Sequence, residues 1–167
     1  MDSINLAATG GFADIVTFIG NFLVLLIVAG AFFFFAIKVG RAAFITLVMS
    51  LYAGFALFTL FPYTKLITGD SVMTIFVANA IIFAVLTYFP YVLLRRISTS
   101  GSIHINTLLL SGLSLLAAGL LLAIGYHALG LSAAVPLTPS LAALFAPSSY
   151  FFWWMAAPLV GIFLTAR

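Results

Sequence analysis

Residues 14–61 read DIVTFIGNFLVLLIVAGAFFFFAIKVGRAAFITLVMSLYAGFALFTLF, two long apolar runs joined by Lys38-Val39-Gly40-Arg41. A membrane-spanning helix needs about 20 mostly apolar residues, and both runs reach that length. A glycine beside two cations is typical of a helix end, and so short a connection forces the two helices into an antiparallel hairpin. The stretch therefore predicts two consecutive transmembrane helices, at about 14–37 and 42–61.

The pattern continues along the chain. Two further runs of spanning length cover about 71–94 and 105–129. A fifth run, 150–165, is shorter and contains Pro158; it can cross a bilayer if its helix begins near Leu141, with a kink at Pro147. We predict an all-α, polytopic transmembrane bundle of four to five spans. Its parts are a short outer segment at 1–13, a four-helix transmembrane core at 14–129, a Pro-rich interfacial or re-entrant segment at 130–149 and a fifth span at 150–167.

Composition agrees with a chain surrounded by lipid. Hydrophobic residues make up 65% of the sequence and charged residues 5%, whereas a soluble domain carries about 25% charged residues. The net charge of +3 is spread along the chain without a polar surface around it, so we expect no nucleic-acid partner. The absence of cysteine excludes disulfides and thiolate metal sites.

The basic residues predict the orientation. With five spans, five of the six Lys and Arg residues fall on one side of the membrane, and Lys65 falls on the other. Basic residues gather in cytoplasmic loops, so the pattern predicts an outer N-terminus and an inner C-terminus. The cations that determine this topology are Lys38, Arg41, Arg95 and Arg96, with Arg167 on the same side.

Residue types that carry chemistry are scarce. No Asp, Glu, Lys or Arg lies in the middle of a predicted span, and Asp14 is expected to cap the first helix at its outer end. His104 and His127 are separated by about 34 Å of helix, so they lie on opposite faces of the membrane and cannot share a metal or a haem. We expect no enzymatic activity, no catalytic residues, no cofactor and no metal site.

Polar and small residues inside the spans favour helix packing. Asn21 and Asn79 are expected to form hydrogen bonds between helices, and the alternative is that they line a pore. Small residues let helix backbones approach closely, either within the bundle or between copies of the chain. The small residues that we select for this role are Ser50, Gly54, Gly112 and Gly119. Tyr88 to Tyr91 and Tyr150 to Trp154 are expected to anchor helices at the headgroup level.

Several short stretches follow one another in a recognisable order: Asp14-Ile15-Val16, Lys38-Val39-Gly40-Arg41, Asn79-Ala80-Ile81-Ile82, the polar loop Arg95 to Ser102 and the Gly- and Leu-rich stretch Leu108 to Gly125. This order resembles the colicin V production (CvpA-like) family of small bacterial inner-membrane proteins. In that family the turn after the first span continues into Gly-Phe and an acidic residue, whereas this chain reads Ala42-Ala43-Phe44. The resemblance implies an accessory role in toxin export or envelope maintenance and supplies no catalytic residues.

The function expected first is that of a non-enzymatic accessory or scaffold protein, in a bacterial cytoplasmic membrane, with lipids and other membrane proteins as partners. A second hypothesis is a small oligomeric channel or uniporter-like transporter, in which Asn21 and Asn79 face one hydrated cavity. A third is a subunit that anchors a quinone or haem near an interfacial histidine.

Overall fold

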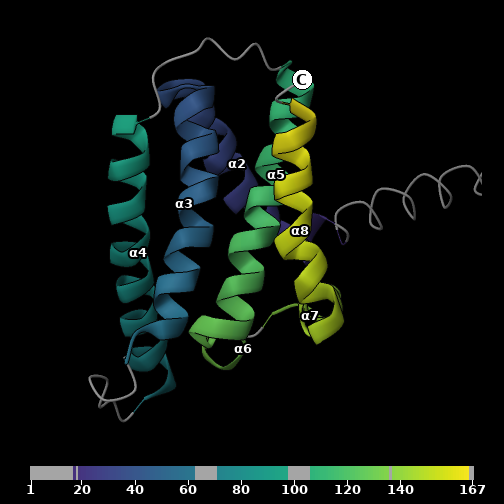
Figure 1. Cartoon of the computed structure of the whole chain (residues 1–167). Helices are drawn as coiled ribbons and strands as arrows, with labels where there is room; N and C mark the ends of the chain where they lie inside the picture. Colours follow the sequence, from purple (N-terminus) through teal and green to yellow (C-terminus); the bar gives the residue numbers. More distant parts are fainter. Residues whose placement is uncertain (1–16, 18, 63–70, 98–105, 136, 166–167) are drawn as a thin grey trace, which may run out of the picture.

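A computed structural model describes residues 17, 19–62, 71–97, 106–135 and 137–165. Every regular element among these residues is a helix, which confirms the all-α prediction (Figure 1). The long helices run alternately up and down, so that each lies antiparallel to the one before it. The helices are α2 (Leu23–Val39), α3 (Arg41–Leu60), α4 (Val72–Ile97), α5 (Thr107–Ile124), the π-helix η2 (Gly125–Leu129), α6 (Leu131–Ala134), α7 (Pro139–Phe145) and α8 (Ser148–Thr165).

Three of these helices are long and apolar enough to cross a membrane, judged by length and composition. They are α3, α4 and the continuous helix Thr107–Leu129, which α5 and η2 form together. The pair of α7 and α8 passes the same test jointly, although the two helices bend by 78° at their junction. The described part of the chain thus has three spanning helices, or four if the bent pair is one span, against the four to five predicted.

The first predicted span is shorter than expected. α2 has 17 residues, or about 25 Å of helix, while the hydrocarbon core is about 30 Å thick. The predicted span 14–37 is mostly apolar, with Asp14, Thr17 and Asn21 as its polar residues, yet the backbone turns at Phe22, between helical residues 19–21 and the start of α2. The hydroxyl of Thr138 donates to the carbonyl of Asn21 over 2.6 Å at this turn. The predicted outer segment 1–13 and Asp14 lie outside the described residues.

α5 lies at the centre of the bundle. It is the most buried of the three spanning helices, and α4 is the most exposed. Ala117, Ala118 and Ala123 of α5 are fully buried, and α2 and α8 pack on this helix. Small side chains on α5 let both neighbours approach it, because close backbone contact replaces the hydrophobic effect as a source of packing energy in lipid.

Two glycines lie where helices come too close for a side chain. A Cβ added to Gly54 of α3 would overlap the hydroxyl of Thr87 and lie 2.9 Å from the Cα of that residue in α4. A Cβ added to Gly119 of α5 would overlap the indole ring of Trp154 in α8. Gly54 therefore permits the close approach of α3 to α4, and Gly119 the seating of Trp154 on α5.

The bend between α7 and α8 falls where Pro147 predicts a kink. The last turn of α7 has carbonyls that no later amide of that helix can reach. The indole Nε1 of Trp154 donates to the carbonyl of Leu144 over 3.2 Å. His127 Nε2 donates to the carbonyl of Phe145 over 2.7 Å. Side chains from α8 and η2 thus satisfy the end of α7.

The close approach of α3 to α4 gives a test. The Gly54→Ala variant is expected to lose about 1–3 kcal/mol of stability, as overpacked sites do, because the Thr87 backbone must move. The measurement is the unfolding midpoint of the purified protein in a mild detergent. Gly112→Ala is the matched control, since Gly112 is exposed in α5 with open space around it. Its midpoint is expected to stay level or rise slightly. Equal midpoints for the two variants would contradict the close contact.

Candidate functional site

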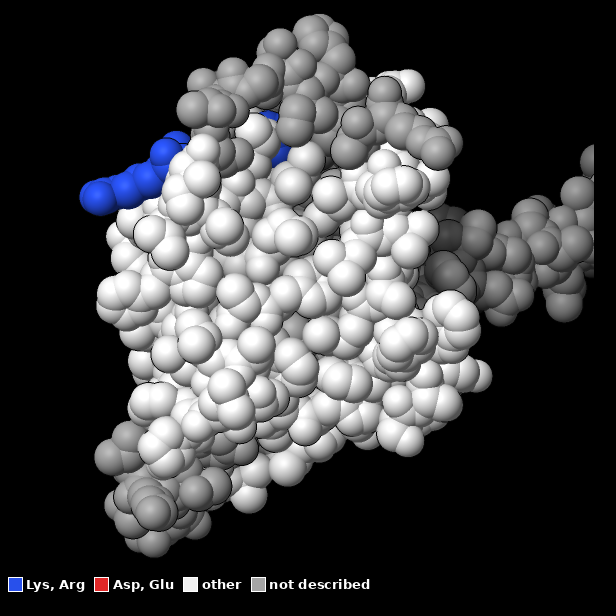
Figure 2. Space-filling model, viewed as in Figure 1, with Lys and Arg blue, Asp and Glu red and all other residues white. Residues whose placement is uncertain are grey.

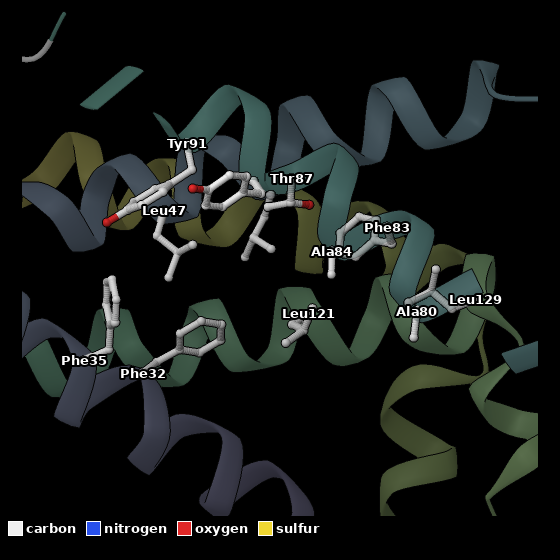
Figure 3. Close-up of a pocket in the computed structure, with 12 residues that line it drawn as sticks. Phe32, Phe35, Leu47, Ala80, Phe83, Ala84, Thr87, Tyr91, Leu121 and Leu129 are labelled. Carbon is white, nitrogen blue, oxygen red and sulfur yellow. The ribbon is translucent and has the colours of Figure 1, made fainter. Parts of the chain in front are cut away.

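A cavity of about 470 Å³ lies between α4 and the helices α2, α3 and α5 (Figure 3). Its walls are apolar, and Thr87, Tyr88 and Tyr91 are the lining residues whose side chains have a polar atom. Phe32, Phe35 and Leu121 lie on the opposite side of the cavity from α4. The lining residues are Phe32, Phe35, Leu47, Leu51, Ala80, Phe83, Ala84, Thr87, Tyr88, Tyr91, Leu121 and Leu129.

The cavity lies beside α4 because α4 is packed against only some of its neighbours. α4 packs chiefly on α3, and it also contacts η2 and α6. Along α4 the lining extends from Ala80 to Tyr91, which is about 16 Å of helix. Large side chains of α2 and α5 do not fill this interval, so an apolar groove remains beside α4.

One end of the cavity lies next to the basic end of the bundle. The guanidinium of Arg95 donates to the hydroxyl of Tyr91 over 3.3 Å, and its Cζ lies 5.9 Å from the centre of that ring. Lys38 Nζ lies 5.6 Å from the centre of the Phe34 ring at the end of α2. Figure 2 shows the visible Lys and Arg atoms near the top of the molecule, where α2 and α4 end and α3 begins.

The four cations expected to determine topology are therefore at the same end of the helices. Lys38 and Arg41 flank the turn from α2 to α3, and Arg95 and Arg96 lie in the last turn of α4. No Asp or Glu belongs to the residues that the structure describes, because the three acidic residues of the sequence fall at positions 2, 14 and 70.

The two asparagines lie in different places. Asn79 is buried, and its Nδ2 donates to the carbonyl of Leu129 over 3.2 Å. Leu129 ends η2, so this bond satisfies a carbonyl that the helix leaves free. Asn21 is half-buried at the turn before α2, next to Thr138. Neither asparagine lines the cavity, so the cavity does not bring them together.

The small residues differ in their surroundings. Ser50 is fully buried, and its hydroxyl donates to the Leu47 carbonyl of its own helix over 2.6 Å. Gly54 and Gly119 lie at the close helix contacts described above. Gly112 is exposed, and a Cβ added to it would meet no atom of another described element within 4 Å. Of the two histidines, His127 is held at Phe145, and His104 lies outside the described residues.

Several residues in these contacts have no distinctive sequence signal. The hydroxyl of Tyr52 donates to the carbonyl of Met155 over 2.6 Å and joins α3 to α8. The sequence shows only that a tyrosine in an apolar run needs a hydrogen-bond partner for its hydroxyl, not which residue that partner is. Tyr88 and Tyr91 fit a headgroup-level belt by position, but in the fold they line the cavity. Within the described residues, Asn79 Oδ1 and Thr87 Oγ1 are buried without a hydrogen-bond partner.

The fold and the cavity define a class, an all-helical bundle whose helices can span a membrane, with an apolar groove beside one of them. No protein-family model matches the chain, and no curated protein or solved structure is significantly similar to it.

The contact at Asn79 gives a second test. The Asn79→Ala variant is expected to lose about 1 kcal/mol of stability, the scale of an interhelical hydrogen bond in membranes. The unfolding midpoint in mild detergent measures it. Asn106→Ala is the matched control, because Asn106 is exposed and its side chain makes no cap hydrogen bond at the start of α5. A loss of the same size in both variants would show that the Leu129 contact contributes nothing specific.

Proposed function

We propose that the chain is a non-enzymatic accessory or scaffold protein of a membrane, which acts by binding lipids and other membrane proteins. The cavity carries the proposal. It is a site of about 470 Å³, within the range of about 300–1,000 Å³ for small-molecule sites. Its apolar lining suits a ligand or partner taken from the bilayer. It offers few groups for acid–base or nucleophilic work.

We further propose that the basic end faces the cytoplasm, which gives an outer N-terminus and an inner C-terminus. Lys38, Arg41, Arg95 and Arg96 support this orientation because they lie together at one end of the bundle. Positively charged residues are retained on the cytoplasmic side during insertion. The resemblance of the sequence to the CvpA-like family is the ground for proposing a bacterial cytoplasmic membrane, with a role in toxin export or envelope maintenance.

The channel hypothesis needs Asn21 and Asn79 along one hydrated path. Neither lines the cavity, and the cavity has an apolar lining. The hypothesis of a cofactor-anchoring subunit needs a quinone or haem near an interfacial histidine. Nε2 of His127 is engaged by the Phe145 carbonyl, and His104 lies outside the described residues. An accessory role is therefore the function that the geometry supports best.

The orientation is tested by cysteine labelling. The sequence contains no cysteine, so a single one can be introduced into an otherwise unchanged chain. Ser71→Cys and Ile97→Cys mark the two ends of α4. A membrane-impermeant maleimide added to intact cells is expected to label only the Ser71→Cys variant, and both variants should react after lysis. Labelling of Ile97→Cys alone in intact cells would reverse the proposed orientation.

The accessory role is tested by purifying the full chain from membranes in a mild detergent. We expect a membrane protein to co-elute in fixed stoichiometry and the complex to re-form when the two purified proteins are mixed in vesicles. An absorbance scan of the same sample checks for a bound chromophore. A colourless homo-oligomer without a partner would overturn the accessory role and favour the channel hypothesis.

A further inference from the structure

The length and position of the cavity match one leaflet of a bilayer. Its lining covers about 16 Å along α4, from Ala80 to Tyr91. This is about half of the 30 Å hydrocarbon core. Tyr91 lies one turn before Arg95, so the cavity begins next to the basic end and extends toward the middle of the bundle.

The lining of the cavity restricts what can enter it. A row of ordered water is disfavoured, because each buried water needs about three polar partners and the walls here are apolar. A flexible apolar chain matches these walls along about 16 Å of α4.

The cations at the basic end of the cavity favour an anionic headgroup on the ligand. The guanidinium of Arg95 lies on the Tyr91 ring at the mouth of the cavity. Lys38, Arg41 and Arg96 lie at the same end of the bundle, and none of the described residues there is acidic. Among the described residues, an anionic headgroup at this level would meet cations and no carboxylate, and each nearby Lys or Arg attracts an anionic lipid by about 1 kcal/mol.

We propose that the cavity binds one acyl chain of an anionic phospholipid from the leaflet at the basic end, with the phosphate at the level of Arg95. The inference rests on the proposed function, because it requires the bundle to lie in a membrane and the cavity to be a binding site. It adds the chemical class of the ligand and the leaflet from which the ligand comes.

The test uses the purified full-length protein in vesicles that contain phosphatidylglycerol or phosphatidylcholine with a photoactivatable group at the end of one acyl chain. After illumination, cross-linked peptides are mapped by mass spectrometry. Cross-links are expected at the lining residues Ala80, Ala84 and Leu121, with phosphatidylglycerol favoured over phosphatidylcholine. Cross-links spread evenly over Ile81, Val85 and Phe89, which are exposed on α4, would overturn the proposal.

A variant pair tests the cavity itself. Ala80→Phe places a ring in the lining and is expected to remove most of the cross-links at Leu121. Ala56→Phe is the control, an equal change at an exposed position of α3 outside the lining, and it should leave these cross-links unchanged. Circular dichroism establishes that both variants fold. If Ala80→Phe does not fold, Ala84→Phe takes its place. If the variant folds and cross-links at Leu121 still form, the proposal is overturned.

A second pair tests the headgroup. Arg95→Gln is expected to lower the preference for phosphatidylglycerol about fivefold, the equivalent of about 1 kcal/mol. Arg96→Gln removes the same charge at the same end without the contact to Tyr91, and it should have a smaller effect. Equal labelling by both lipids in the unmodified protein, or displacement of the label by an added quinone, would overturn the anionic phospholipid as ligand. A negative result here does not change whether a membrane protein co-purifies with the chain. The lipid proposal and the accessory role can therefore fail separately.

Discussion

Where a helix is interrupted in the interior of the protein, its last carbonyls have no amide of that helix to donate to them, so another part of the protein must do so. This constraint explains much of the structure. At each of several interruptions, a side chain from a different element donates to the carbonyl that the break leaves free. These pairs are Thr138 with Asn21, Asn79 with Leu129, His127 with Phe145 and Trp154 with Leu144. A further bond between elements, from Tyr52 of α3, reaches the carbonyl of Met155 inside α8, three residues before Pro158.

The same bonds hold distant parts of the chain together. Asn79 links α4 to the end of η2, and Tyr52 links α3 to α8. Because these donors lie on other helices, a break in one helix becomes a point of attachment for its neighbour. The bent ends of the bundle are therefore compatible with a well-packed interior around α5.

The cavity is a consequence of this arrangement of attachments. α4 is drawn close to α3 where Gly54 has no side chain, and it meets η2 at Asn79. The backbone of α4 thus has two points of attachment, and the side chains of α2 and α5 do not fill the interval beside it. A groove with apolar walls and a basic mouth is what remains, and the proposed lipid would complete the packing there.

The sequence was enough to predict helices, their approximate ends and the gathering of four cations at one end, because run length and charge position act locally. α3 and α4 begin and end within a few residues of the predicted 42–61 and 71–94. It was not enough to predict the turn at Phe22, because the run around that residue is mostly apolar and of spanning length, and the bond from Thr138 comes from far along the chain. Pro147 predicted a kink, but the 78° angle depends on contacts made by Trp154 and His127.

Within the candidate site, too, some features were predictable from the sequence and others were not. Asparagines and glycines inside apolar runs are visible in the sequence, and two of the glycines do lie at close helix contacts. Which residues line the cavity was not predictable, since Phe32, Ala84 and Leu121 resemble the other apolar residues of their helices. The sequence by itself determined that the chain forms apolar helices with a basic end, because burial in lipid and retention of charge depend on composition along the chain. Only the tertiary structure decided where a cavity remains, because that depends on how far apart the packed helices are held.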